Sequence, residues 1–145
     1  MIKFFSMDRL SKEERSSNMA AIKSKNTKPE LLIFKELKKR GLHFKKHYKI
    51  TGKPDIVFLE QRIAIFIDGE FWHGRNFNSW KNKLSDFWLK KIGENIKRDK
   101  KSTLLLKLDG WRVIRIWDKK ITRHPEAALK RILKAVESIP VNDPE

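Results

Sequence analysis

Two short apolar stretches joined by a tight turn constrain the fold of this chain most strongly. Residues 55–59 are apolar after their first position, and residues 63–67 are apolar and rich in β-branched side chains. Glu60 and Gln61 supply the turn between the two stretches. Because β-branched residues favour extended backbone, the pattern predicts two neighbouring strands of one sheet.

Helical patterns stand on both sides of these strands. Ser11 and Thr27 are each followed three residues later by glutamate, the spacing of a capping box at a helix start. The periodicity predicts helices over 11–23, 27–41, 84–108 and 125–138, and further strands over 44–50 and 111–117. This order predicts an α/β fold in which helices flank a mixed β-sheet.

A length of 145 residues fits a single domain. We expect an N-terminal extension over 1–10, one folded domain over 11–139 and a disordered tail over 140–145. The absence of cysteine excludes disulfides and thiolate zinc sites. No apolar run approaches the ~20 residues that span a bilayer, so we expect no membrane partner and a cytoplasmic, nucleoid-associated protein.

The charge balance indicates a polyanionic partner. The chain has 34 lysines and arginines against 18 aspartates and glutamates, a formal net charge of +16. Nucleic acid is the leading partner for such a chain, although ribosomal and membrane-surface proteins can be as basic. Charge alone leaves a nucleic-acid enzyme and a plain binding module equally open.

Acidic residues stand at the ends of the two apolar strands. Asp55 follows a Gly-Lys-Pro turn at the start of a strand too apolar for an unpaired charge, so a metal ion or a basic partner would explain it. Asp68 and Glu70 follow the second strand. All three have an ordinary alternative as turn residues. Together they have the composition of a site for a divalent cation.

His73 is the best candidate for a general base, because a histidine with a pKa near 6.5 takes up a proton near neutral pH. Phe71 and Trp72 precede it and need either a core or a stacking partner. The remaining histidines stand in charged surroundings and are expected at the surface; they are His43, His47 and His124.

A third group of polar residues lies on the predicted helix over 84–108. Lys91, Asn95 and Asp99 are spaced four residues apart and share one face, which suits a phosphate or a metal-bound water. The alternative is an ordinary amphipathic helix with Phe87 and Trp88 in the core.

Taken in order, these residues resemble the very short patch repair (Vsr-type) endonucleases, bacterial enzymes that nick DNA beside a T·G mismatch. The matching segments are 15–22 (RSSNMAAI), 52–55 (GKPD), 71–73 (FWH), 87–95 (FWLKKIGEN), 98–99 (RD) and 110–113 (GWRV). The resemblance implies the restriction-endonuclease-like fold, which is shared with metal-dependent nucleases of the PD-(D/E)xK type.

The resemblance also implies roles for individual residues. Asp55 would be the side-chain ligand of Mg²⁺ and the main-chain carbonyl of Ile67 the second protein ligand. His73 would be the general base, and Glu30 would orient His73 or a metal-bound water. Glu30 is also the third residue of a capping box, so both interpretations stay open.

DNA contacts follow from the same resemblance. Lys91, Asn95 and Asp99 look like the family's polar stripe. Its intercalating aromatics, which wedge into the base stack, would here be Phe71, Trp72 and Trp88, and Met19 would belong to an arm that enters from the opposite groove. Unstacking costs a few kcal/mol per step, so a wedge favours a weakly stacked mismatch.

The chain departs from the family at two places. The positions of the structural zinc ligands carry Glu70, Arg75, Phe77 and Lys119, so we expect no structural zinc. Asp68 replaces the family's usual histidine and is a candidate for a further metal ligand.

We therefore expect a monomeric Mg²⁺-dependent endonuclease that hydrolyses a phosphodiester bond in duplex DNA, a nickase of the T·G mismatch repair type. The alternatives are a site-specific homing or restriction-type nuclease of the same fold and a non-catalytic basic DNA-binding module.

Overall fold

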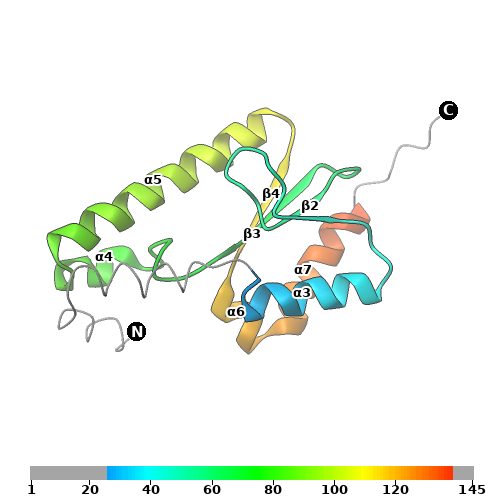
Figure 1. Ribbon diagram of the computed structural model, residues 1–145, viewed down its shortest axis with the longest axis horizontal. Coiled ribbons are helices and arrows are strands. Elements are labelled where there is room, and N and C mark those ends of the chain that lie inside the picture. Colours follow the sequence, from blue (N-terminus) through cyan, green and yellow to red (C-terminus); the bar gives the residue numbers. More distant parts are fainter. Residues whose placement is uncertain (1–25, 139–145) are drawn as a thin grey trace.

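The computed structural model describes residues 26–138. Met19, the predicted helix over 11–23, the extension over 1–10 and the tail over 140–145 lie outside the described residues. Within the described part, the elements follow the predicted order of helix, strands, helix, strand and helix (Figure 1).

A four-stranded mixed sheet forms the centre of the molecule. Its strands lie in the order β1 (Lys45–Lys46), β2 (Ile56–Phe58), β3 (Ile63–Asp68) and β4 (Arg112–Trp117). The first two pairings are antiparallel and the last, between β3 and β4, is parallel. The predicted mixed sheet is confirmed.

Helices cover both faces of this sheet. The helices α3 (Lys28–Lys39), α6 (Asp118–Arg123) and α7 (Pro125–Ser138) share one core cluster with the sheet, and α5 (Asp86–Leu108) packs on the opposite face. In Figure 1, α5 lies above the sheet and the other three helices lie below it. The result is the predicted arrangement of a sheet between two helical layers.

Alternation along β3 divides its side chains between the two layers. Ile63, Ile65 and Ile67 pack with α3, α6 and α7, whereas Ala64 and Phe66 pack on the α5 face. Because successive strand residues point to opposite faces, Asp68 also lies on the α5 face. The parallel register pairs Phe66 with Arg115, which places polar side chains of β3 and β4 beside α5.

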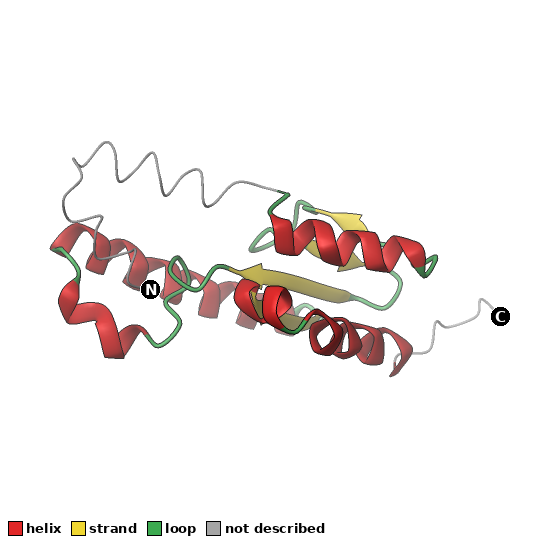
Figure 2. Cartoon of the chain, turned by 90° about the horizontal axis from the view of Figure 1, so that it is seen from below, coloured by secondary structure: helices red, strands yellow, loops and turns green. Residues whose placement is uncertain are grey.

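A second helical region extends beyond the sheet. The N-terminal half of α5, with the short helices α4 (Phe77–Trp80) and η2 (Lys81–Lys83), projects to one side (Figures 1 and 2). It has its own buried core, formed by Phe71, Trp72, Trp80, Trp88 and Ile92. The loop that leaves β3 therefore connects the sheet to this aromatic core.

The structure differs from the predicted elements in a few places. The predicted strand over 44–50 is reduced to two residues, because the chain turns at His47, which has a φ of 48°. A glycine at position 93 predicts an interruption of the helix over 84–108, but α5 continues through Gly93. The short helices α4, η2 and α6 carry too few residues to show a helical period, and we did not predict them. Among the residues described, no helix is both long and apolar enough to span a membrane.

Candidate active site

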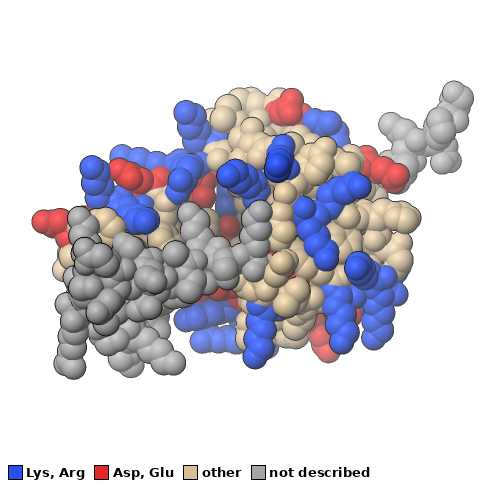
Figure 3. Space-filling model, in the orientation of Figure 1, with Lys and Arg blue, Asp and Glu red and all other residues tan. Residues whose placement is uncertain are grey.

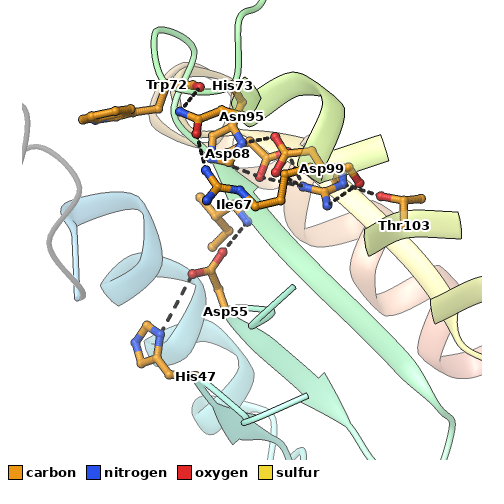
Figure 4. A network of polar contacts seen from close by, with 11 residues as sticks. His47, Asp55, Ile67, Asp68, Trp72, His73, Asn95, Asp99 and Thr103 are labelled. Carbon is orange, nitrogen blue, oxygen red and sulfur yellow. Dashed lines mark hydrogen bonds and ion pairs between the residues drawn. The ribbon is translucent and has the colours of Figure 1, made fainter. Parts of the chain in front are cut away.

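Asp55 is fixed at the end of β3 by strand pairing. Its main-chain N–H donates to the carbonyl of Ile65 at 2.9 Å, and its side-chain Oδ2 accepts from the N–H of Ile67 at 2.6 Å (Figure 4). The side chain is 19% exposed. The two residues predicted to supply metal ligands, Asp55 and Ile67, are thus brought together by the antiparallel pairing of β2 with β3.

Three elements converge on this carboxylate. Glu30 from α3, His47 after β1 and Asp55 before β2 each offer one ligand atom, and these atoms all lie within 4.8 Å of one another. His47 Nε2 is 3.7 Å from Glu30 Oε2, and His47 Nδ1 is 3.9 Å from Asp55 Oδ1. The prediction that His47 is a surface residue is wrong: its side chain is only 18% exposed.

Glu30 lies both at the start of α3 and in the cluster with His47 and Asp55. Its Oε2 accepts a hydrogen bond from the main-chain N–H of Asn26 at 2.7 Å, so it caps the start of α3. The same buried carboxylate faces His47 and Asp55. The Thr27 side chain makes no capping hydrogen bond. Glu30 therefore acts as a cap without leaving the cluster.

The cluster brings two carboxylates close to each other. In the described part of the chain, no lysine or arginine forms an ion pair with Glu30 or Asp55. Burial raises the pKa of Asp55 to about 7; the hydrogen bond from Ile67 opposes this shift and the carboxylate of Glu30 adds to it. A buried carboxylate, a partly exposed one and an imidazole, with no ion-paired lysine or arginine in the part of the chain described, fit a divalent cation.

A second polar group lies on the α5 side of β3. His73 Nδ1 is hydrogen-bonded to Oδ2 of Asp99 on α5, and His73 Nε2 is 3.8 Å from Oδ1 of Asp68 (Figure 4). Gly74 permits this approach: its φ is +66°, and a Cβ there would lie 2.4 Å from Ile96 on α5. Asp99, predicted to contact DNA, is thus the partner of the predicted base.

The surroundings of His73 favour its charged form. Burial alone lowers the pKa of His73, but the hydrogen bond to Asp99 and the charges of Asp68 and Asp99 outweigh that effect and raise it overall. In its neutral form, a ring that donates Nδ1–H to Asp99 presents Nε2 as a proton acceptor.

Asp68 lies with His73 and not in the Glu30, His47 and Asp55 cluster. Arg115 Nη1 donates to both carboxylate oxygens of Asp68 at 3.1 Å. Asp68, the predicted further metal ligand, is therefore paired with an arginine that the sequence pattern does not mark. The parallel register of β3 and β4, which places Arg115 on the α5 face, is the signal that could have identified it.

The three residues of the polar stripe on α5 make different contacts. The ammonium of Lys91 lies 5.1 Å from the ring centroid of Trp72 and 5.9 Å from that of Trp88. The Asn95 amide is buried, donating to the main-chain carbonyl of Trp72 at 3.1 Å and accepting from Arg98. Asp99 holds His73. The side chain of Asn95 is therefore hydrogen-bonded within the protein and does not face the solvent.

The predicted intercalating aromatics lie in the second core. Phe71, Trp72 and Trp88 are 4%, 5% and 2% exposed. Their rings meet edge to face, with centroids 5.8 Å apart for Phe71 and Trp88 and 6.0 Å apart for Trp72 and Trp88. A role as a wedge in DNA requires rings to leave this core.

The four residues at the family's zinc positions do not fit a zinc ion. Glu70 accepts from Arg75 Nη1 at 2.5 Å and pairs with Lys119 Nζ at 3.3 Å, so two cations already neutralise its carboxylate. Phe77 packs edge to face on Trp80 at 5.4 Å. We call the ion pairs of Glu70, Arg75 and Lys119 the Glu70 ion-pair cluster; it joins the loop after β3 to α6.

The surface is suited to a nucleic acid. Lysine and arginine side chains are spread over much of the face drawn in Figure 3. With an excess of 16 positive charges in the whole chain, this surface attracts a phosphate backbone.

Comparison with known proteins identifies the family. The profile of the family described as DNA mismatch endonuclease Vsr matches residues 7–79. The chain belongs to the Vsr family. A Vsr-type nicking enzyme of Haemophilus parainfluenzae, named type II nicking enzyme V.HpaIIP, is 44% identical over 90% of this chain and 96% of its own length. Type II nicking enzyme V.NmeDIP of Neisseria meningitidis serogroup C is 40% identical over 90% of both chains.

The DNA mismatch endonuclease Vsr of Escherichia coli (strain K12) is 37% identical over 74% of this chain and 70% of its own length. These comparisons confirm the predicted family and enzyme class: this Vsr-family chain is a DNA endonuclease, and DNA is its substrate class. The α/β fold with a mixed sheet agrees with the restriction-endonuclease-like fold that the resemblance implied.

Proposed function

We propose that this chain nicks duplex DNA beside a T·G mismatch by Mg²⁺-dependent hydrolysis of one phosphodiester bond. One observation carries the proposal: the cluster of Glu30, His47 and Asp55, which has no ion-paired lysine or arginine within residues 26–138, and the histidine–aspartate pair both lie at the end of β3. The printed names of the relatives support it, because one is a DNA mismatch endonuclease and others are nicking enzymes.

The cluster supplies oxygen ligands for the cation. Asp55 and the main-chain carbonyl of Ile67 would hold Mg²⁺, with Glu30 beside them. Oxygen donors are the ligands that Mg²⁺ prefers. When bound, Mg²⁺ polarises the scissile phosphate and stabilises charge on the leaving oxygen. Asp68 is left out of this set, because Arg115 contacts both of its oxygens.

His73 takes the proton of the attacking water. The water oxygen forms the new bond to phosphorus, its proton passes to Nε2 of His73, and the bond from phosphorus to the leaving sugar oxygen breaks. Asp99 accepts Nδ1–H throughout, which holds the ring in one tautomer and stabilises the imidazolium that forms.

We assign the proposed contacts with DNA to aromatic residues of the second core. Phe71, Trp72 and Trp88 would wedge into the base stack, with Met19 entering from the opposite groove. Lys91 lies at these rings and supplies a positive charge for a phosphate. One catalytic site in a monomer suits the cutting of one strand, and binding along the chromosome would make the protein nucleoid-associated.

Single-turnover nicking of a strand-labelled T·G duplex tests the metal requirement. Wild-type protein is expected to cut one strand with Mg²⁺ and not with EDTA. Asp55→Asn is expected to retain DNA binding, measured by fluorescence anisotropy, and to lose cutting. Cutting in EDTA, or by Asp55→Asn at the wild-type rate, would contradict the proposal.

A further inference from the structure

Arg115 on β4 is held by groups from two neighbouring elements, α5 and β3. Its Nε donates to Thr103 Oγ1 on α5 at 2.8 Å, and its Nη2 donates to the main-chain carbonyl of Asp99 at 3.3 Å. Its Nη1 donates to both oxygens of Asp68, and the guanidinium lies 4.0 Å from the ring centroid of Phe66. Each nitrogen of the guanidinium therefore has an acceptor inside the protein.

The two acidic residues that Arg115 contacts are the same two that flank His73. Asp99 binds Nδ1 of the imidazole, and Asp68 lies 3.8 Å from Nε2. The Asp68 side chain is 8% exposed and that of Arg115 is 22% exposed, so the pair is largely shielded from water. One planar guanidinium thus fixes the groups on both sides of the general base.

We propose that Arg115 is a positioning residue, which acts through Asp68 and Asp99 to hold the His73 ring, and that Asp68 serves this purpose and not metal binding. The inference rests on the proposed function of His73 as the base. Arg115 is not assigned a contact with DNA, because each nitrogen of its guanidinium already has an acceptor inside the protein.

The chemistry of the guanidinium explains why an arginine is needed. A guanidinium presents several N–H donors in a rigid plane and can bind Asp68 and the Asp99 carbonyl together, whereas the ammonium of lysine is a single flexible point charge. Without Arg115, the carboxylates of Asp68 and Asp99 would face each other across the imidazole without the charge of the guanidinium beside them. Their repulsion would move both from His73.

The first test separates positioning from DNA binding by kinetics. Arg115→Lys is expected to lower kcat by roughly 10-fold or more and to leave KM within about twofold, since the loss lies in the transition state. Arg112→Ala is the matched control, because Arg112 lies on the same strand and its exposed side chain donates to Ser138 Oγ at 3.0 Å, away from His73. It is expected to leave kcat unchanged. An unchanged kcat for Arg115→Lys, or a raised KM alone, would overturn the proposal.

The second test loosens the guanidinium without changing its charge. Thr103→Val removes only the hydroxyl that accepts from Nε. It is expected to lower kcat by a few-fold with KM unchanged. In the double variant Asp68→Asn, Arg115→Lys, kcat is expected to fall less than the product of the two single effects, because both changes act on one contact. If the two single effects on kcat multiply in the double variant, Asp68 and Arg115 act independently, which would contradict a shared function.

A third readout needs no activity. The Nδ1–H proton of His73 is expected to give a downfield NMR signal, assigned by its loss in His73→Asn, and this signal is expected to broaden or shift in Arg115→Lys but not in Arg112→Ala. An unchanged signal in Arg115→Lys would overturn the positioning proposal alone. Failure of wild-type protein to nick DNA, with the NMR result as expected, would instead overturn the proposed function.

Discussion

His73 and Asp99, 26 residues apart in the chain, are joined by a hydrogen bond between the imidazole Nδ1 and the carboxylate. His73 comes from the turn after β3, and Asp99 comes from the middle of α5. Because the bond occupies Nδ1, the other ring nitrogen is left to accept a proton. The base of the proposed reaction is therefore a pair of residues.

Removing either member should impair the same step. We expect His73→Ala to lower kcat by roughly 10²–10⁴-fold, as for loss of a general base, and Asp99→Asn to lower it less. KM should change little. The double variant should be no slower than His73→Ala alone, because Asp99 acts through the histidine. Single-turnover kinetics measure all three, and multiplicative losses would refute the pairing.

Metal binding should depend on pH through Asp55. Burial raises the pKa of Asp55 to about 7 in the folded protein, whereas the ordinary pKa of aspartate is 3.8. The free energy of unfolding of the metal-free protein should therefore fall as pH rises from about 4 to about 7. Mg²⁺ needs the deprotonated carboxylate, so its stabilising effect should grow over the same range.

Thermal unfolding checks this linkage. The rise in Tm on addition of Mg²⁺ should be larger at about pH 8 than at about pH 5.5, and Asp55→Asn should show little rise at either pH. A rise of equal size at both pH values, or one that survives in Asp55→Asn, would place the metal elsewhere.

The Glu70 ion-pair cluster should stabilise the loop after β3 without metal. Glu70→Gln leaves Arg75 and Lys119 without their counter-charge, and we expect it to lower the free energy of unfolding by roughly 1–3 kcal/mol. Glu36→Gln is the control, because it breaks an exposed pair with Arg40 and should have a much smaller effect. Urea denaturation in EDTA measures both; a zinc-dependent stability of the wild-type protein would contradict this account.

The aromatic core should matter for stability in the absence of DNA. Trp88 is 2% exposed and contacts the rings of Phe71, Trp72 and Phe87. Trp88→Ala should cost about 3–5 kcal/mol of unfolding free energy. Leu104→Ala, at a residue 57% exposed on the same helix, should stay within about 0.5 kcal/mol. Comparable losses in both variants, measured by urea denaturation, would show that the rings do not form a core.

Much of the fold could be predicted because the signals are local. The β-branched run of β3 and the helical periods of α3 and α7 each lie within one segment, and the structure confirms them. The brevity of β1 could not be predicted in the same way, since it depends on a left-handed turn at His47. A histidine rarely adopts that conformation, and nothing adjacent marks it.

The site could be predicted less completely than the fold, because strand register and helix packing bring its residues together from distant parts of the sequence. Asp55 could be singled out from its apolar strand, and His73 from its chemistry. The helical period predicts that Asp99 shares a face with Lys91 and Asn95. It does not predict the loop that brings His73 to Asp99. In the sequence, Arg115 is one polar residue within a strand. Only the parallel pairing of β4 with β3 places it beside Asp68.

The most direct measurement compares two strand-labelled duplexes that are identical except for one T·G pair in place of T·A, each with Mg²⁺. We expect a nick in one strand of the mismatched duplex only. We expect no nick in EDTA and none with Asp55→Asn. Equal cutting of both duplexes, or cutting of both strands at one sequence, would contradict the mismatch-nicking function and favour a site-specific nuclease of the same fold.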